Sequence, residues 1–221
     1  EILDWHGVGM SVMEMSHRSK EFVSVLESAK QNLIKLLDIP DNYEVLFMQG
    51  GASTLFAQIP ANLTPGFESA AYLDTGVWSA KAIKEAAKYT NVNVVVSSKD
   101  SNYQTVPSFE GLEIDESSSY LHITPNETIG GLEFDALPDT QVPIVADLSS
   151  TILSRKIDVS RYGLIYAGAQ KNIGPAGVVV VIIRKDLLAR SQDSLPTTWN
   201  FAKIAENGSM VKTTPTCPLN P

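Results

Sequence analysis

One lysine lies in a short segment of small residues between two apolar runs. Lys171 follows the run 162–167 and precedes the run 178–183, which consists of six β-branched residues. Such a run is typical of a strand buried on both faces, and the glycines on each side of the lysine allow a flat molecule to approach the backbone. A lysine held there can lose its proton and attack a carbonyl group to form a Schiff base. The alternative is a lysine that only reaches water, which is the commoner case.

Two further residues could act on a flat, charged ligand. Asp147 ends an apolar run and could pair with a cationic ring nitrogen, or it could cap the turn that follows. Trp78 follows the segment 74–77 and could stack on a ring, or it could fill the core. Each residue taken alone leaves both interpretations open.

Two other segments favour the binding of anions. Residues 50–53, Gly-Gly-Ala-Ser, lie between an expected strand and an expected helix, where free N–H groups and the helix dipole favour a phosphate. A plain turn would use the same residue types. His17 and Arg18 could bind a carboxylate or a phosphate, or they could be a solvated pair. A lysine, a strand-end aspartate, an aromatic ring and a phosphate-binding turn together are the groups that pyridoxal phosphate requires.

The spacing of apolar residues locates the elements that must position these groups. Strands are expected at 43–48, 70–73, 92–96, 120–123, 142–146, 164–167 and 178–183. Helices are expected at 21–37, 54–63 and 79–89, with the end of another helix at 1–5 and no strong period after residue 191. The alternation of strands and helices predicts an α/β fold with a mainly parallel, mixed sheet flanked by helices. Ligands bind such sheets at the carboxyl ends of the strands. Residues 50–53, Trp78, Thr128, Asp147 and Lys171 fall at such ends.

The composition of the 221-residue chain narrows the class of protein. The net charge of −8 argues against a nucleic-acid surface, which needs a basic stripe. No apolar run is long enough to span a membrane. The single cysteine, Cys217, fits a reducing compartment, so a cytoplasmic location is expected. We expect no metal site.

Five blocks of the sequence carry a resemblance to a known family. They are residues 11–18, 74–81, 125–128, 149–155 and 167–174. In these blocks the chain closely resembles the phosphoserine aminotransferase family, which belongs to the class V, fold-type I pyridoxal-phosphate enzymes. The resemblance covers residues 1–216 and implies the large cofactor-binding domain of such an enzyme. Residues 217–221 form a tail without recognised resemblance.

The resemblance implies a role for each residue that would contact the cofactor ring. Lys171 matches the lysine that holds pyridoxal 5'-phosphate as a Schiff base and moves the proton of the substrate. Asp147 matches the aspartate that pairs with the ring nitrogen, and Trp78 matches the tryptophan that stacks on the ring. Thr128 matches the threonine near the phenolic oxygen.

The resemblance also implies residues that would bind anionic groups. Ala52, Ser53 and Gln170 match positions beside the cofactor phosphate, and His17 with Arg18 match residues that receive the anionic groups of the substrate. Lys212 and Thr213 match a segment that completes the phosphate site of the neighbouring subunit in a homodimer with shared active sites. Members of the family usually have asparagine where this chain has Lys212, and many have Gly-Gly-Gly and an arginine at the turn 50–53.

The implied reaction transfers the amino group of glutamate to 3-phosphohydroxypyruvate, giving O-phospho-L-serine and 2-oxoglutarate in serine biosynthesis. No nucleic-acid or membrane partner is expected. Members of the family also carry an N-terminal segment and a smaller C-terminal domain that this sequence lacks, so a fragment that binds cofactor without turnover is one alternative. Another class V enzyme, such as a serine–glyoxylate aminotransferase, is a second. A cysteine desulfurase fits less well, because it needs a reactive cysteine and Cys217 has no lysine or histidine close in sequence.

Overall fold

A computed structural model describes residues 3–134 and 136–211 of the chain. The helices are α1 (Lys20–Leu36), α2 (Ala52–Leu63), α3 (Val77–Ala86), α4 (Ala169–Asn172), α5 (Lys185–Leu188) and α6 (Phe201–Glu206), with short 3-10 turns η1 (Lys99–Ser101) and η2 (Val159–Arg161). The strands are β1 (Tyr43–Gly50), β2 (Ser69–Asp74), β3 (Asn91–Ser97), β4 (Leu121–Ile123), β5 (Asn126–Glu127), β6 (Leu132–Glu133), β7 (Ile144–Asp147), β8 (Leu164–Gly168) and β9 (Gly177–Arg184).

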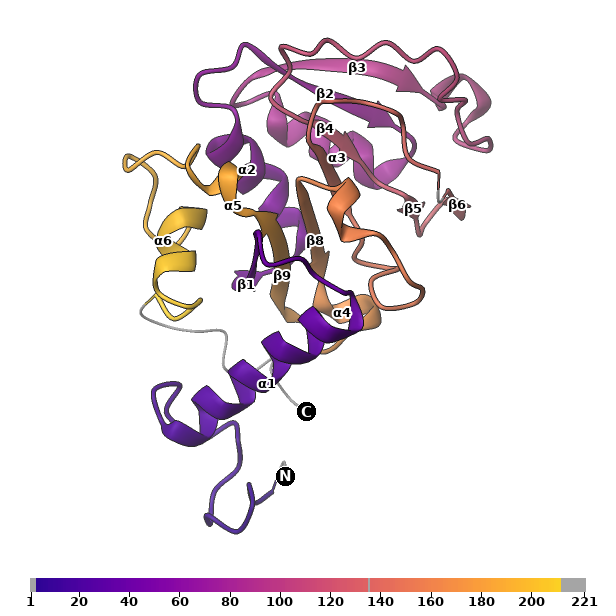
Figure 1. Cartoon of the computed structure of the whole chain (residues 1–221). Helices are drawn as coiled ribbons and strands as arrows, with labels where there is room; N and C mark the ends of the chain where they lie inside the picture. Colours follow the sequence, from indigo (N-terminus) through magenta and orange to yellow (C-terminus); the bar gives the residue numbers. More distant parts are fainter. Residues whose placement is uncertain (1–2, 135, 212–221) are drawn as a thin grey trace.

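The described residues form a seven-stranded mixed sheet in the order β1-β9-β8-β7-β4-β2-β3 (Figure 1). The neighbouring pairs from β8 through β7, β4 and β2 to β3 are parallel. Strand β9 is antiparallel to both of its neighbours, β1 and β8, so it alone runs against the other six. Strands β5 and β6 form a separate two-stranded sheet. The predicted α/β fold with a mainly parallel, mixed sheet is therefore confirmed.

Apart from the edge strand β3, which is largely exposed, the main sheet is buried on both faces, and its side chains alternate between two cores. On β9, Val178, Val180 and Ile182 belong to a first core that α1 covers through Phe22 and Leu26. The intervening residues Val179, Val181 and Ile183 belong to a second core, which also contains side chains of α2, α3, α5 and α6. Burial on both faces explains why this strand is an uninterrupted apolar run rather than an alternating one.

The longest helix, α1, shows how local sequence sets the boundary of an element. The side chain of Ser19 accepts a hydrogen bond from the N–H of Phe22 at 3.1 Å and caps the first turn, which also contains Glu21. A serine cap and an early acidic residue both favour the amino end of a helix. The apolar face of α1 packs on the sheet, and the helix runs past α4 (Figure 1).

All seven strands of the main sheet and the helices α1–α3 were expected, with boundaries that differ by a few residues. The expected helix end at 1–5 is wrong for residues 3–5, which form a bend. The spacing of apolar residues did not indicate α6, a helix of only six residues held by the buried Phe201 and Ile204. None of the helices within 3–134 and 136–211 is long and apolar enough to cross a membrane.

The six strands that run in one direction bring their carboxyl ends to one edge of the sheet. At this edge α2 follows β1, α3 follows β2, and β5 follows β4. At the same edge Asp147 is the last residue of β7, and α4 follows β8 directly. The topology alone therefore gathers the chemically interesting segments at one edge.

Candidate functional site

Lys171 meets two of the other predicted residues at the carboxyl edge of the sheet. Its Nζ donates a hydrogen bond of 2.5 Å to Oγ1 of Thr128 and lies 4.6 Å from the centroid of the Trp78 ring. The three residues come from α4, the segment after β5, and α3. The fold therefore joins segments that are far apart in the sequence around one amine.

The Trp78 ring also has a second cation beside it. Nζ of Lys81, one turn further along α3, lies 4.5 Å from the same ring centroid. Both ammonium groups are within the range of a cation–π interaction. The indole Nε1 is buried, and within the described residues it has no hydrogen-bond partner. A ring that bears an unpaired buried donor is open to a further polar contact.

Glu127 fixes the position of Trp78, and it was not singled out from the sequence. Its two carboxylate oxygens accept the N–H groups of Trp78 and Ser79, each at 2.8 Å, so Glu127 caps the amino end of α3. Its side chain is 1% exposed. Glu127 directly precedes Thr128, so one short segment holds Trp78 through one residue and contacts Lys171 through the next.

Asp147 is a buried carboxylate at the end of β7. Its Oδ1 accepts hydrogen bonds from the N–H of Ser149 at 3.0 Å and from the Ser149 hydroxyl at 2.6 Å. Burial raises the pKa of Asp147 above its ordinary value, while the two Ser149 bonds and the positive charge of Lys171 oppose this rise. Asp147 thus caps the turn after β7, which is one of the two roles expected from the sequence. The positive charge of Lys171 also acts on its carboxylate.

The turn 51–53 lies against the segment that carries Lys171. A β-carbon on Gly168 would lie 3.1 Å from the backbone nitrogen of Ala52 and 2.7 Å from Oε1 of Gln170, so glycine allows this close approach. The N-cap of α2 is Gly51, which offers no side-chain cap, and the first turn contains no acidic residue. Gln170 and the N–H groups of the first turn of α2, which includes Ala52 and Ser53, therefore form one polar corner that suits an anion.

The predicted substrate residues are not brought to Lys171 by any contact within the described part of the chain. His17 is half-buried and Arg18 is exposed, just before α1, and Nε of Arg18 donates a weak hydrogen bond of 3.4 Å to Nε2 of His17. Lys212 and Thr213 lie outside the described residues. Within 3–134 and 136–211 there is no group of three His, Cys, Asp or Glu side chains that could hold a metal ion.

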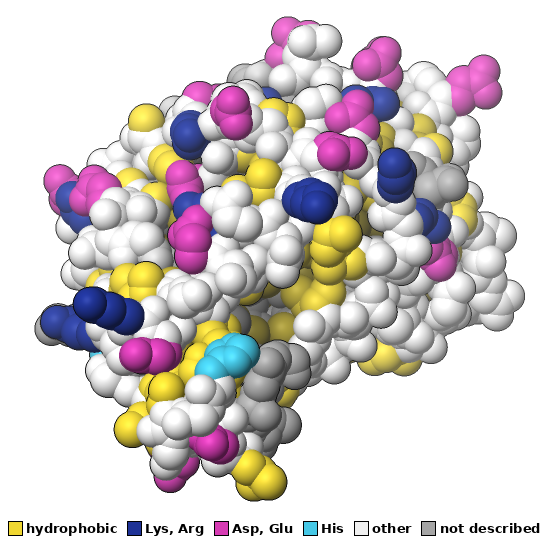
Figure 2. Space-filling view, turned by 60° about the horizontal axis from the view of Figure 1, so that its bottom comes forward, with side chains coloured by type: hydrophobic (Ala, Val, Ile, Leu, Met, Phe, Trp, Pro, Cys, Tyr) yellow, Lys and Arg dark blue, Asp and Glu magenta, His cyan; other side chains and the backbone are white. Residues whose placement is uncertain are grey.

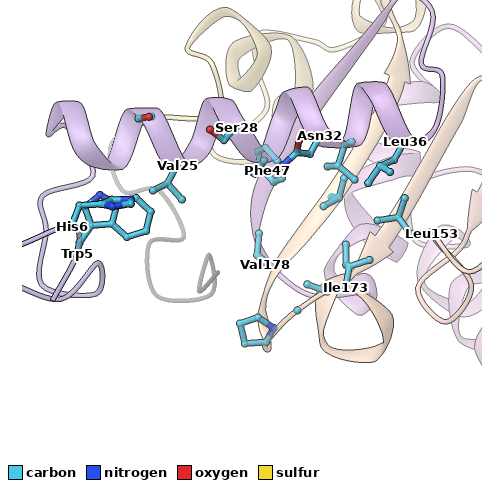
Figure 3. Close-up of a pocket in the computed structure, with 17 residues that line it drawn as sticks. Trp5, His6, Val25, Ser28, Asn32, Leu36, Phe47, Leu153, Ile173 and Val178 are labelled. Carbon is cyan, nitrogen blue, oxygen red and sulfur yellow. The ribbon is translucent and has the colours of Figure 1, made fainter. Parts of the chain in front are cut away.

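A groove lies beside α4, and neither Lys171 nor Trp78 nor Thr128 is among the residues that line it. It has a volume of about 510 Å³ and runs between α1, α4 and the strands β1 and β9 (Figure 3). Its lining is mostly apolar and includes Val25, Leu36, Phe47, Ile173 and Val178. The space-filling view shows hydrophobic side chains gathered around a hollow on this side of the molecule (Figure 2).

Comparison with known proteins gives a consistent family. The class-V aminotransferase family matches residues 1–217. The chain is 73% identical over 216 residues to phosphoserine aminotransferase of Marinomonas sp. (strain MWYL1), a match that covers 98% of this chain and 60% of that protein. It is 58% identical over 217 residues to phosphoserine aminotransferase of Pseudomonas syringae pv. tomato, with the same coverage.

Solved structures agree with these relatives. Phosphoserine aminotransferase from Bacillus circulans subsp. alkalophilus matches with a TM-score of 0.94 and 47% identity, over 98% of this chain and 60% of that one. The pyridoxal-phosphate-bound phosphoserine aminotransferase from Trichomonas vaginalis matches with a TM-score of 0.91 and 39% identity, over 98% and 61%. The chain spans about 60% of the length of the curated relatives that it matches. By sequence and by fold, the chain belongs to the class-V aminotransferase family.

Proposed function

We propose that the chain is the large, cofactor-binding part of a phosphoserine aminotransferase that uses pyridoxal 5'-phosphate. The observation that carries the proposal is the position of the Lys171 amine, hydrogen-bonded to Thr128 and held over the ring of Trp78. Relatives that are 73% and 58% identical bear the name phosphoserine aminotransferase, which supports the choice of this reaction within the family.

The residues present fit pyridoxal phosphate. The ring needs a flat face, and Trp78 offers one whose buried Nε1 has no hydrogen-bond partner in the part of the chain that the structure describes. The ring nitrogen needs a carboxylate, and Asp147 takes both Ser149 bonds on Oδ1, so Oδ2 takes neither. The phosphate needs donors, and the first turn of α2 has neither a side-chain cap nor an acidic residue that would repel it. A lysine, an acid, a flat ring and an anion site of this kind are what the cofactor requires.

Each of these residues then has a task in amino-group transfer. When bound, pyridoxal phosphate supplies a ring that accepts the electron pair left when a proton leaves the substrate. Lys171 would hold the cofactor through its amine and move the proton at the substrate α-carbon. Asp147 would keep the ring nitrogen protonated, Trp78 would orient the ring, and Thr128 would hold the Lys171 amine in place.

The remaining features of the enzyme are part of the same proposal. The substrates would be glutamate and 3-phosphohydroxypyruvate, with His17 and Arg18 receiving their anionic groups. Residues 1–216 would form the large domain, and Lys212 and Thr213 would complete the phosphate site of the other subunit in a homodimer. A cytoplasmic location rests on the single cysteine, which fits a reducing compartment.

Covalent labelling tests the central assignment. The chain is incubated with pyridoxal phosphate, reduced with borohydride, digested, and searched by mass spectrometry for the modified lysine. We expect the label on Lys171 and its loss in Lys171→Ala. The matched control is Lys81→Ala, because the Lys81 amine lies 4.5 Å from the Trp78 ring centroid, against 4.6 Å for Lys171, and should not carry the label. A label on Lys81, or no saturable label at all, would overturn the proposal.

The substrate assignment needs a second measurement. Adding glutamate to the loaded chain should change the absorption spectrum of the cofactor, because the amino group leaves the substrate. 3-Phosphohydroxypyruvate should restore the original spectrum, and glyoxylate should not. Restoration by glyoxylate alone would favour another class V aminotransferase.

A further inference from the structure

A buried group of polar aromatic residues lies behind Asp147, on the face of the sheet that carries the second core. His122 of β4 and Tyr166 of β8 are 2% and 0% exposed. His122 is in register with Tyr72 of β2, and Tyr166 is in register with Asp147 of β7. His122 is a titratable group that none of the roles described above uses.

A hydrogen bond between His122 and Tyr166 and the register of β7 and β8 connect this group to Asp147. Nε2 of His122 lies 2.8 Å from the hydroxyl oxygen of Tyr166. Tyr166 is paired in register with Asp147 on the same face of the sheet, and burial, the negative charge of Asp147 and a hydrogen bond to its carboxylate raise the pKa of Tyr166. The His122 ring stacks on Tyr72 with a centroid distance of 4.9 Å, and the Tyr72 hydroxyl bonds to that of Tyr120 at 2.6 Å.

The protonation of His122 follows from its surroundings. Burial lowers the pKa of His122 to about 3, so the ring is neutral near pH 7 and carries one proton. Nδ1 is buried and has no hydrogen-bond partner within the described residues. A proton on Nδ1 would leave a buried N–H without an acceptor, which is rare and costly, whereas an unpaired acceptor is tolerated better. The proton therefore belongs on Nε2.

This tautomer sets the direction of the other bonds. If Nε2–H donates to the Tyr166 oxygen, the single hydroxyl proton of Tyr166 stays free to donate to Asp147. If Nε2 instead accepted from Tyr166, the hydroxyl proton would be used there and Asp147 would lose its donor. We propose that His122 and Tyr166 are positioning residues for Asp147, with His122 directing the Tyr166 hydroxyl to donate to the Asp147 carboxylate.

The other groups around this network have separate effects. Ser149 and Lys171 favour the ionised form of Asp147, and Glu127 disfavours it. Tyr72 and Tyr120 have pKa values raised by burial, so they stay neutral beside His122. In the proposed network the donor from Tyr166 adds to Ser149 and Lys171 against the burial that raises the pKa of Asp147. The inference takes its functional meaning from the proposed pairing of Asp147 with the cofactor, but the network exists without cofactor.

Nuclear magnetic resonance of the chain without cofactor tests the proposal. The ¹⁵N shifts of the imidazole give the tautomer, and His122→Gln identifies which of the three histidine signals belongs to His122. ¹³C-labelled aspartate gives the titration midpoint of Asp147. Tyr166→Phe should raise that midpoint by about one pH unit, because a donor to the carboxylate is lost. The matched control is Tyr72→Phe, which removes a buried hydroxyl of the same cluster that bonds to Tyr120 rather than to Asp147, and should leave the midpoint in place.

Two results would overturn the proposal. One is a proton on Nδ1 of His122 in the unsubstituted chain, which decides the matter even if Tyr166→Phe does not fold. The other is a midpoint of Asp147 that Tyr166→Phe shifts no more than Tyr72→Phe does. Neither result depends on covalent labelling of Lys171, so a failure of the proposed function and a failure of this network are distinguishable.

Discussion

The side chain of Glu127 fills the space beside Gly76 that a β-carbon would need. A β-carbon on Gly76 would lie 2.6 Å from Cδ of Glu127. The same carboxylate accepts the N–H groups of Trp78 and Ser79, so glycine at 76 is what lets Glu127 reach the start of α3. The orientation of Trp78 beside Lys171 thus depends on a contact between two residues that do not themselves touch the amine.

Glu127→Gln should destabilise the chain. The two N–H groups at the start of α3 would lose a charged acceptor, and a buried charge-assisted bond contributes about 1.5–3 kcal/mol. Urea unfolding measures the loss. The matched control is Glu133→Gln on β6, where the exposed ion pair with Arg155 should contribute about 1 kcal/mol or less. Equal losses in the two variants would show that the Glu127 cap contributes little.

Gly76→Ala should destabilise the chain by disturbing the contact between residue 76 and the Glu127 side chain. The added β-carbon would overlap Glu127, and forcing an extra methyl group into a packed site costs about 1–3 kcal/mol. The control is Gly130→Ala, because a β-carbon there would lie 3.9 Å from the backbone oxygen of Glu127, an ordinary contact. Thermal unfolding of both variants makes the comparison, and a Gly76→Ala variant as stable as Gly130→Ala would contradict the packing argument.

The sequence predicted the main sheet and the meeting of Lys171, Trp78 and Thr128, because buried strands have clear apolar runs and parallel strands align their ends. It did not reveal the capping role of Glu127, which acts on Trp78 across 49 residues of sequence. His122 and Tyr166 lie in apolar segments and resemble core residues until their hydrogen bonds are seen. Such contacts depend on which strands become neighbours, and local spacing does not carry that information.

The stability of the chain should fall as the pH is lowered from 7, and His122 should account for part of the fall. The pKa of His122 is about 3 in the folded chain and about 6.5 when unfolded. Between these values the unfolded chain takes up a proton that the folded chain does not. The contribution of His122 to the free energy of unfolding is therefore fully present above about pH 6.5 and is lost progressively below it. The decrease is about 1.4 kcal/mol per pH unit within the window.

Asp147 changes the free energy of unfolding with pH in the opposite direction to His122. Its pKa is raised on folding, so its contribution is present at low pH and lost as the pH rises through the folded value. Between pH 7 and 5 the carboxyl groups of an unfolded chain stay largely ionised, so the protons that the unfolded chain takes up there go mainly to its histidines. His122→Gln should reduce the slope of unfolding free energy against pH in this range. Tyr72→Phe changes the packing beside His122 without removing the titrating ring, and should keep the slope; an unchanged slope in His122→Gln would refute the assignment.

Under the proposed function, Asp147→Asn should slow the reaction of the loaded chain with glutamate by about a hundredfold, the usual loss when a preorganised electrostatic partner is removed. An asparagine can still accept the Ser149 bonds on its oxygen, so the turn after β7 should persist, but it cannot keep a ring nitrogen protonated. Stopped-flow absorbance measures the rate, and labelling of Lys171 shows that the cofactor still binds.

Asp158→Asn is the matched control for this variant. Asp158 accepts the same two bonds from Ser160, at 3.0 Å from the N–H and 2.6 Å from the hydroxyl, yet these bonds lower the pKa of Asp158 while burial raises that of Asp147. The local geometry is therefore shared, and burial at the edge of the sheet beside Lys171 is what distinguishes Asp147. Asp158→Asn should react at the unsubstituted rate. If Asp147→Asn does so as well, Asp147 serves only to cap its turn, as Asp158 does.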